Sequence, residues 1–202
     1  MNYTGPKVRL SRALGIAITP KAARIMEAKG YPPGQHGPNP RRRPRIQGFK
    51  AQLLEKQRLR AQYNVHERQM RTYFKRASKA RDNTGDVLVV LLETRLDALV
   101  LRSGFARTIY AARQYVNHRH IQVNGESVDR PGFSIRPGDE IAIRPKSRKM
   151  LCFREALQGS PGIPDYLTLN KDQMVARLDR LPVREEIPVI CDVAKVVEFY
   201  SR

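Results

Sequence analysis

The feature that most constrains the fold is a change of hydrophobic period within residues 94–146. Apolar side chains first recur at helical spacing, as Leu96, Leu99 and Val100 do at i, i+3 and i+4. Further along, they alternate with polar residues on either side of an Asn-Gly pair at 124–125. Such a pair is typical of a two-residue hairpin turn, because both of its residues must adopt positive φ. The segment therefore predicts two short helices followed by a small antiparallel sheet.

Helix caps and further alternating runs refine this prediction. Thr94 and Thr108 precede the two helices, and a threonine hydroxyl can accept a hydrogen bond from an amide of the first turn. We therefore expect both threonines to be N-caps. Three later runs that resemble strands, at 139–143, 166–169 and 174–178, are expected to complete and extend the sheet.

Positive charge is concentrated in the first part of the chain. The formal net charge is +19, and residues 1–81 hold 20 lysines and arginines against three acidic residues. The remaining residues, 82–202, are nearly balanced. An excess of this size indicates a polyanionic partner such as nucleic acid. The first part is therefore the expected main surface for phosphate groups.

Segments of different composition predict the domain organisation. Residues 1–49 are rich in proline, glycine and arginine, which favours an extended basic arm that either orders against RNA or remains a solvated tail. Residues 50–93 predict amphipathic helices, completed by an apolar C-terminal helix at 188–202 that returns to pack on them. Residues 94–187, with a core at 94–149, form the expected inserted domain. The predicted class is α+β, with a mostly helical domain and an insertion of two short helices on a twisted antiparallel sheet.

Other classes of protein are disfavoured by the sequence. No apolar run reaches the roughly 18–20 residues that span a bilayer, and no hydrophobic signal core is recognisable, so we expect an unsecreted protein without a membrane partner. Cys152 and Cys191 belong to no CxxC pair, and two buried reduced thiols are favoured over a disulfide. His118 and His120 lack a nearby thiolate or carboxylate, which makes a poor zinc site. Nucleotide-binding and metalloprotease motifs are also missing, so we expect no cofactor, no metal and no enzymatic activity.

Motifs along nearly the whole chain resemble one family. Within the inserted domain they are RLD at 95–97, AARQYVNH at 111–118, HIQVNG at 120–125 and IRPGD at 135–139. In the flanks they are YTGP at 3–6, PGQHG at 33–37, LEKQRLR at 54–60, HERQM at 66–70 and VEFYSR at 197–202. In order and spacing they resemble the family of the fourth protein of the small ribosomal subunit, whose small RNA-binding domain other proteins also contain.

The resemblance implies a function and a set of partners. It implies a structural constituent of the small ribosomal subunit that binds the 5′ domain of 16S-type ribosomal RNA early in assembly and contributes to translational accuracy. The implied partners also include neighbouring small-subunit proteins, especially the fifth, and messenger RNA near the channel through which it enters. The implied location is the ribosome, in the cytoplasm or in an organelle. Many bacterial relatives carry a four-cysteine zinc cluster near the N-terminus, but no cysteine precedes Cys152 here, so zinc is not carried over.

Two alternatives use the same small domain. An RNA-modifying enzyme would need an additional catalytic fold, and a binder of stalled ribosomes would be a much shorter chain without the basic arm. Asp97 and Glu93 form a carboxylate pair that could act as acid and base, although pairing of Asp97 with a neighbouring arginine is favoured.

The candidate RNA-binding residues are mostly arginines, because a planar guanidinium bridges phosphate oxygens and stacks on exposed bases. For each residue the alternative is a solvated surface charge. By similarity, residues near the messenger channel would be Arg41, Arg42, Arg43 and Arg45. The candidates on the helices are Arg58, Arg68, Arg71, Lys75 and Arg76. Those in the inserted domain are Arg95, Arg107, Thr108, Arg113, Gln114, His118 and Arg136.

Overall fold

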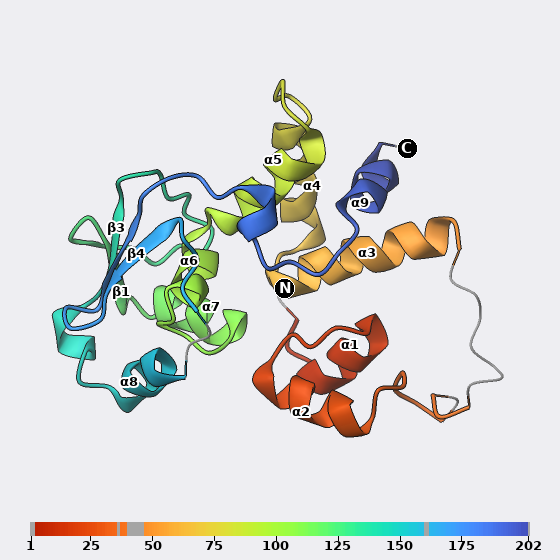
Figure 1. Cartoon of the computed structure of the whole chain (residues 1–202), viewed down its shortest axis with the longest axis horizontal. Coiled ribbons are helices and arrows are strands. Elements are labelled where there is room, and N and C mark those ends of the chain that lie inside the picture. The colour runs from red at the N-terminus through yellow and green to blue at the C-terminus, as the bar shows by residue number, and fades with distance from the viewer. Residues whose placement is uncertain (1–2, 36, 40–46, 160–161, 202) are drawn as a thin grey trace. The chain divides into compact units, whose positions relative to one another are not determined.

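The chain folds into two units, the second of which is inserted into the first. The computed structural model describes residues 3–35, 37–39, 47–159 and 162–201. Residues 1–85 and 189–202 form the first unit, and residues 86–188 form the second. The described residues thus form a mixed fold of helices and one small antiparallel sheet, which agrees with the predicted α+β class (Figure 1). No helix among them is long and apolar enough to cross a membrane.

Helices form the regular structure of the first unit in its described residues. Helix α5, Thr84–Glu93, begins in this unit and continues into the second. The other helices are α1 (Lys7–Leu14), α2 (Pro20–Ala28), α3 (Phe49–Gln62), α4 (Glu67–Ala77) and α9 (Val193–Tyr200).

The prediction of an extended arm over residues 1–49 is wrong for the residues of α1 and α2, which are helical. Glycine and proline there mark the ends of the helices and do not prevent them. Gly15 ends α1 in the left-handed conformation, with φ of 69°, which glycine adopts without strain. The hydroxyl of Thr19 accepts a hydrogen bond from the amide of Ala22 at 3.2 Å, and Pro20 occupies the first turn of α2.

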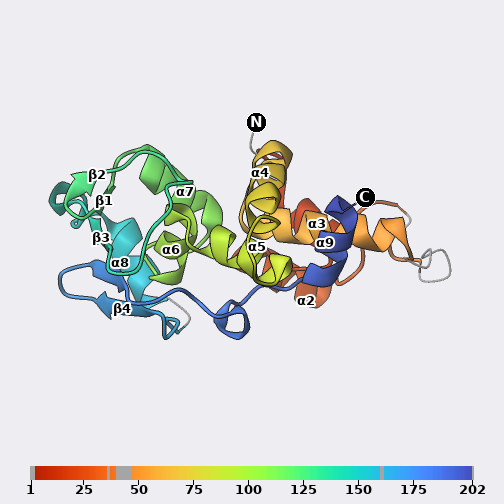
Figure 2. The same ribbon diagram turned by 90° about the horizontal axis from the view of Figure 1, so that it is seen from above.

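Helix α9 packs on α3, as the apolar C-terminal segment predicted. The rings of Phe199 and Phe49 stack with centroids 5.5 Å apart. The amide of Gln52 donates a hydrogen bond to the Glu198 carboxylate at 2.8 Å. In both ribbon views α9 lies beside α3 (Figures 1 and 2). The two ends of the first unit are therefore joined by apolar and polar contacts between residues far apart in sequence.

A five-stranded antiparallel sheet forms one layer of the second unit, and its strand order is β2-β1-β3-β5-β4. Asn124 and Gly125 adopt φ of 50° and 84° between β1 and β2, which confirms the predicted hairpin turn. The predicted later strands are also present. The strands are β1 (Ile121–Val123), β2 (Glu126–Ser127), β3 (Glu140–Ile143), β4 (Leu167–Asn170) and β5 (Val175–Leu178).

Three helices cover one face of this sheet. They are α6 (Leu96–Arg102), α7 (Ile109–Asn117) and α8 (Leu151–Gln158), and all three contribute side chains to one hydrophobic core with β1, β3 and β5. Figure 2 shows α6 and α7 beside the strands. The sequence predicted only the first two helices. Helix α8 is short, and the burial of Phe153 depends on contacts such as the ring of Tyr115, 4.7 Å away between centroids. The described part of this unit also contains the short 3-10 helices Pro145–Ser147 and Arg184–Glu186.

One predicted N-cap is correct and the other is wrong. Thr108 caps α7, and its hydroxyl accepts a hydrogen bond from the amide of Ala111 at 3.1 Å. Thr94 instead donates its hydroxyl to the carbonyl of Val90 at 3.0 Å, so it belongs to the end of α5. The residue at the N-cap of α6 is Arg95, which makes no side-chain cap.

Candidate nucleic-acid interface

Helix α4 exposes a face of positive charge. Met70 and Ala77 are buried, which fixes the side of α4 that faces the protein. The opposite side carries four exposed cations, and the name basic face of α4 refers to these residues: Arg68, Arg71, Lys75 and Arg76. Helical spacing thus gathers four of the predicted residues on one surface.

The acidic residue that begins α4 is already compensated by positive partners. Glu67 accepts contacts from Lys56 Nζ at 3.0 Å and Arg60 Nη1 at 3.2 Å, and Arg71 Nε lies 3.7 Å away. The hydroxyl of Tyr200 donates to the same carboxylate at 2.9 Å. Burial alone would raise the pKa of Glu67, but the hydrogen bonds from Lys56 and Tyr200 outweigh it and lower the pKa. Glu67 therefore leaves most of the positive potential of the basic face in place.

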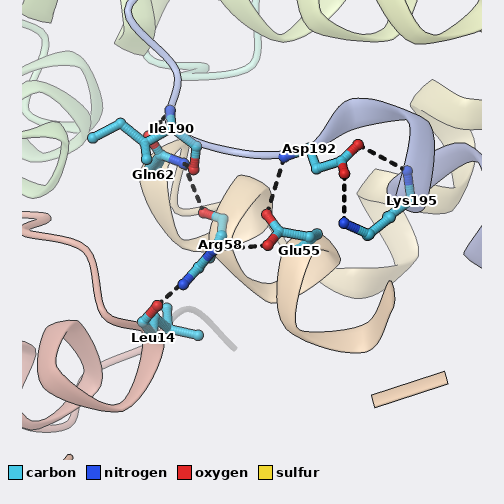
Figure 3. Close-up of polar contacts among 7 residues, drawn as sticks. All are labelled: Leu14, Glu55, Arg58, Gln62, Ile190, Asp192 and Lys195. Carbon is cyan, nitrogen blue, oxygen red and sulfur yellow. Dashed lines mark hydrogen bonds and ion pairs between the residues drawn. The ribbon is translucent and has the colours of Figure 1, made fainter. Parts of the chain in front are cut away.

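Arg58 is placed differently from the residues of the basic face, because protein groups surround its guanidinium (Figure 3). Its Nε donates to the carbonyl of Leu14 at 2.8 Å, and its Nη1 donates to Glu55 Oε1 at 2.7 Å. The other carboxylate oxygen of Glu55 accepts the amide of Asp192 at 3.0 Å. The half-buried Arg58 therefore connects α1, α3 and the segment that leads into α9.

Arg95 is buried inside the second unit. Its side chain is 1% exposed and that of Asp97 is fully buried. The guanidinium donates two hydrogen bonds to this carboxylate, at 2.9 Å from Nε and 2.6 Å from Nη2. Burial raises the pKa of Asp97, whereas the charge of Arg95 opposes that rise. The favoured pairing of Asp97 with an arginine is therefore confirmed, and we leave Arg95 out of the candidate surface.

The other predicted residues of α7 remain at or near the surface. Three of them are exposed: Arg107, Gln114 and His118. Their helical spacing places them on one side of α7, with Arg107 just before its N-cap. Arg113 is half-buried, with Nη1 at 3.4 Å from Asp97 Oδ2. The Thr108 hydroxyl is engaged in the cap of α7. We call the set Arg107, Arg113, Gln114 and His118 the α7 surface.

Arg136 lies apart from α7, in the loop that leads into β3. Its side chain is exposed and lines a hollow of about 670 Å³ at the β-hairpin, together with Asn124, Phe133 and Asp139. The backbone amide of Arg136 donates to Asp139 Oδ2 at 2.8 Å, which holds this loop in place.

Other basic residues fall outside these surfaces. Arg41, Arg42, Arg43 and Arg45 lie outside the described residues. Four further cations are exposed around the 3-10 helix that precedes α8, and they were not among the predicted RNA-binding residues. Their close spacing in the sequence could have indicated a basic surface there. These residues are Arg144, Lys146, Lys149 and Arg154.

The described residues contain no group of three or more histidine, cysteine or acidic side chains placed to hold a metal ion. His120 Nδ1 lies 2.9 Å from Ser147 Oγ, and His118 points to the exposed surface of α7. Both cysteines, Cys152 and Cys191, are half-buried, and thus more exposed than the sequence predicted.

Comparison with known proteins identifies the family. Residues 2–93 match the family described as ribosomal protein S4/S9 N-terminal domain, and residues 94–141 match the S4 domain. Small ribosomal subunit protein uS4 of Streptomyces griseus subsp. griseus is 55% identical over 100% of this chain and 99% of its own length. The proteins of the same name from Streptomyces coelicolor and Micrococcus luteus are 54% and 52% identical, over 100% and 96% of this chain and 99% and 95% of theirs. The helical unit, the inserted sheet and these full-length matches together show that the chain belongs to the uS4 family of small ribosomal subunit proteins.

Proposed function

We propose that this chain is a structural constituent of the small ribosomal subunit and binds the 5′ domain of its 16S-type RNA. The observation that carries the RNA contact is the basic face of α4, where four exposed cations lie beside Glu67, a carboxylate that is already shared among Lys56, Arg60 and Tyr200. A surface of this kind attracts phosphate groups with little regard to base sequence. The relatives, which carry the name of a small-subunit protein, support the same assignment.

The α7 surface is the second proposed RNA contact. Arginine, glutamine and histidine side chains there can donate to phosphate and ribose oxygens. Asp97 Oδ2 lies 3.4 Å from Nη1 of Arg113 and restricts its side chain. Arg113 therefore loses less conformational entropy when it binds RNA. Arg136 adds a separate basic contact at the hairpin.

The finer roles are proposals that rest on membership of the family. We propose that the chain binds early in assembly, contacts the fifth protein of the subunit and thereby contributes to translational accuracy. Arg41, Arg42, Arg43 and Arg45 are proposed to approach messenger RNA near the channel through which it enters. The proposed location is the ribosome of the cytoplasm or of an organelle. From the family we propose that the helical domain includes 50–93 with 188–202 and that the insertion is 94–187, whereas the compact second unit of the structure begins at residue 86. The alternative of an RNA-modifying enzyme receives no support from relatives that are named as ribosomal proteins.

Binding to RNA at increasing salt concentration tests the proposal. The purified chain is titrated with a fragment of the 5′ domain and with an unrelated duplex of equal length. We expect the logarithm of both binding constants to fall with the logarithm of the salt concentration, by roughly 0.9 or less for each phosphate contacted. The fragment should retain its preference at high salt, because its folded shape presents more matching contacts. Equal binding of the two RNAs at every salt concentration would contradict a specific rRNA-binding role.

A further inference from the structure

A hollow of about 410 Å³ lies between α4 and α9 in the first unit. Its volume is within the range of sites that receive small ligands, roughly 300–1,000 Å³. Its lining combines aromatic rings with two cations of the basic face. The residues are Arg71, Phe74, Lys75, Ser78, Phe199 and Tyr200.

The aromatic part of this hollow is held in a fixed arrangement. The rings of Phe74 and Tyr200 lie with centroids 5.0 Å apart, and those of Phe199 and Tyr200 are perpendicular at 5.3 Å. The hydroxyl of Tyr200 donates to Glu67 at 2.9 Å, and burial together with this carboxylate raises the pKa of Tyr200, so the hydroxyl stays protonated at neutral pH. All three rings are half-buried, and therefore each keeps part of its surface accessible to a ligand.

The rim of the hollow is positively charged. Lys75 is exposed and forms no ion pair within the described part of the chain. Arg71 is also exposed and lies 3.7 Å from Glu67, whose charge is shared with Lys56 and Arg60. An apolar floor of rings and a cationic rim are the two features that bind a nucleotide outside a duplex, because the base stacks and the phosphate pairs with cations.

From this combination we propose that the hollow receives one unstacked nucleotide of the bound RNA. Its base would lie against the rings of Phe74 and Tyr200, and its phosphate beside Arg71 and Lys75. This inference rests on the proposed RNA binding and adds which structural feature of the RNA is recognised at α4. A fully paired duplex lacks that feature, because its bases are stacked on one another.

A tryptophan reporter tests the base contact. The chain contains no tryptophan, so Phe74→Trp introduces a single one into the lining. We expect its fluorescence to be quenched by the 5′-domain fragment, through stacking of a base, and to be unchanged by saturating polyphosphate or by a blunt RNA duplex. Circular dichroism and thermal unfolding verify that the variant folds. Equal quenching by polyphosphate or by poly-glutamate would assign the hollow to a general anion or to an acidic protein segment and would overturn the proposal.

A matched pair of leucine variants tests the energetic contribution. Phe74→Leu removes a ring from the hollow, whereas Tyr3→Leu removes an exposed ring that lines neither this hollow nor the one at the β-hairpin. Since stacking of one base contributes roughly 1–3 kcal/mol, Phe74→Leu should weaken binding of the fragment by about fivefold or more, and Tyr3→Leu should not. If the wild-type chain prefers the fragment but both variants bind alike and the tryptophan is not quenched, only the nucleotide site is refuted. If the wild-type chain shows no preference for the fragment, the proposed function itself fails.

Discussion

Two arginines of the inserted unit, Arg95 and Arg102, and the arginines of α4 occupy opposite environments. Arg95 is 1% exposed and paired with the buried Asp97, and Arg102 Nε lies 2.5 Å from the buried Glu93. On α4, by contrast, Arg68 and Arg76 are exposed. The comparison teaches that arginine serves two purposes in this chain: Arg95 and Arg102 neutralise buried carboxylates, and the arginines of α4 supply surface charge.

Of the variants that test this comparison, removal of a buried carboxylate should cause the largest loss of stability. Asp97→Asn keeps the shape of the side chain but leaves the buried guanidinium of Arg95 without its counter-charge. We expect a loss of about 3–5 kcal/mol in the free energy of unfolding, measured by urea denaturation. Asp129→Asn is the control, because Asp129 pairs with Arg119 at the surface and its loss should leave stability unchanged. Equal stability of the two variants would show that the burial of Arg95 does not depend on its partner.

The hydroxyl of Tyr166 should have the next largest effect. It donates to the buried Glu93 at 2.8 Å, and burial raises the pKa of Tyr166, so the hydroxyl stays protonated. Tyr166→Phe leaves this carboxylate with one donor fewer, and we expect a loss of about 1–3 kcal/mol in thermal or urea unfolding. Tyr31→Phe serves as control, because the ring of Tyr31 contacts Arg12 and its hydroxyl is not needed for that contact. A Tyr166→Phe variant as stable as the Tyr31→Phe variant would argue against a buried network around Glu93.

The contacts of Glu67 on α4 should stabilise the fold in a pH-dependent way, and by less than the buried pairs of the inserted unit. Its pKa in the folded chain is below that of an unfolded glutamate, about 4.3, so its contacts stabilise the fold above that pH. The contribution should be lost as the pH falls through the lower, folded pKa. We expect at most about 1 kcal/mol, because the carboxylate is partly solvated. Urea unfolding at pH values between 6 and 3 should show a shallower acid loss for Glu67→Gln than for the wild-type chain, and identical slopes would contradict the prediction.

The exposed arginines of α4 should affect stability least and RNA binding most directly. Arg68→Gln and Arg76→Gln should each change the free energy of unfolding by no more than about 0.5 kcal/mol. Each should also reduce the slope of log K against log salt for the 5′-domain fragment by up to about 0.9, if the residue contacts one phosphate. Arg119→Gln is the matched control, since this exposed arginine is already paired with Asp129. Unchanged slopes in both α4 variants would remove the basic face from the proposed interface.

Features that depend on neighbouring residues were predictable from the sequence. The cap at Thr108 and the turn at 124–125 need only a few adjacent residues, and both are present. The same local reasoning failed for glycine and proline, because these residues occur both in extended segments and at the ends of helices. The proline and glycine content of residues 1–49 favours an extended arm, but in the structure Gly15 ends α1 and Pro20 begins α2.

The sequence by itself determined the family, the basic character of the first part and the order of most helices and strands, because motifs, charge and hydrophobic period are properties of contiguous residues. Only the tertiary structure decided which cations are available at the surface. Arg95 and Arg68 look alike in the sequence, yet the first is enclosed with Asp97 and the second is exposed. Likewise, the hollow between α4 and α9 is lined by Phe74 and Tyr200, which are separated in the sequence by the whole second unit. Burial depends on contacts between distant segments, and these form only when the chain folds.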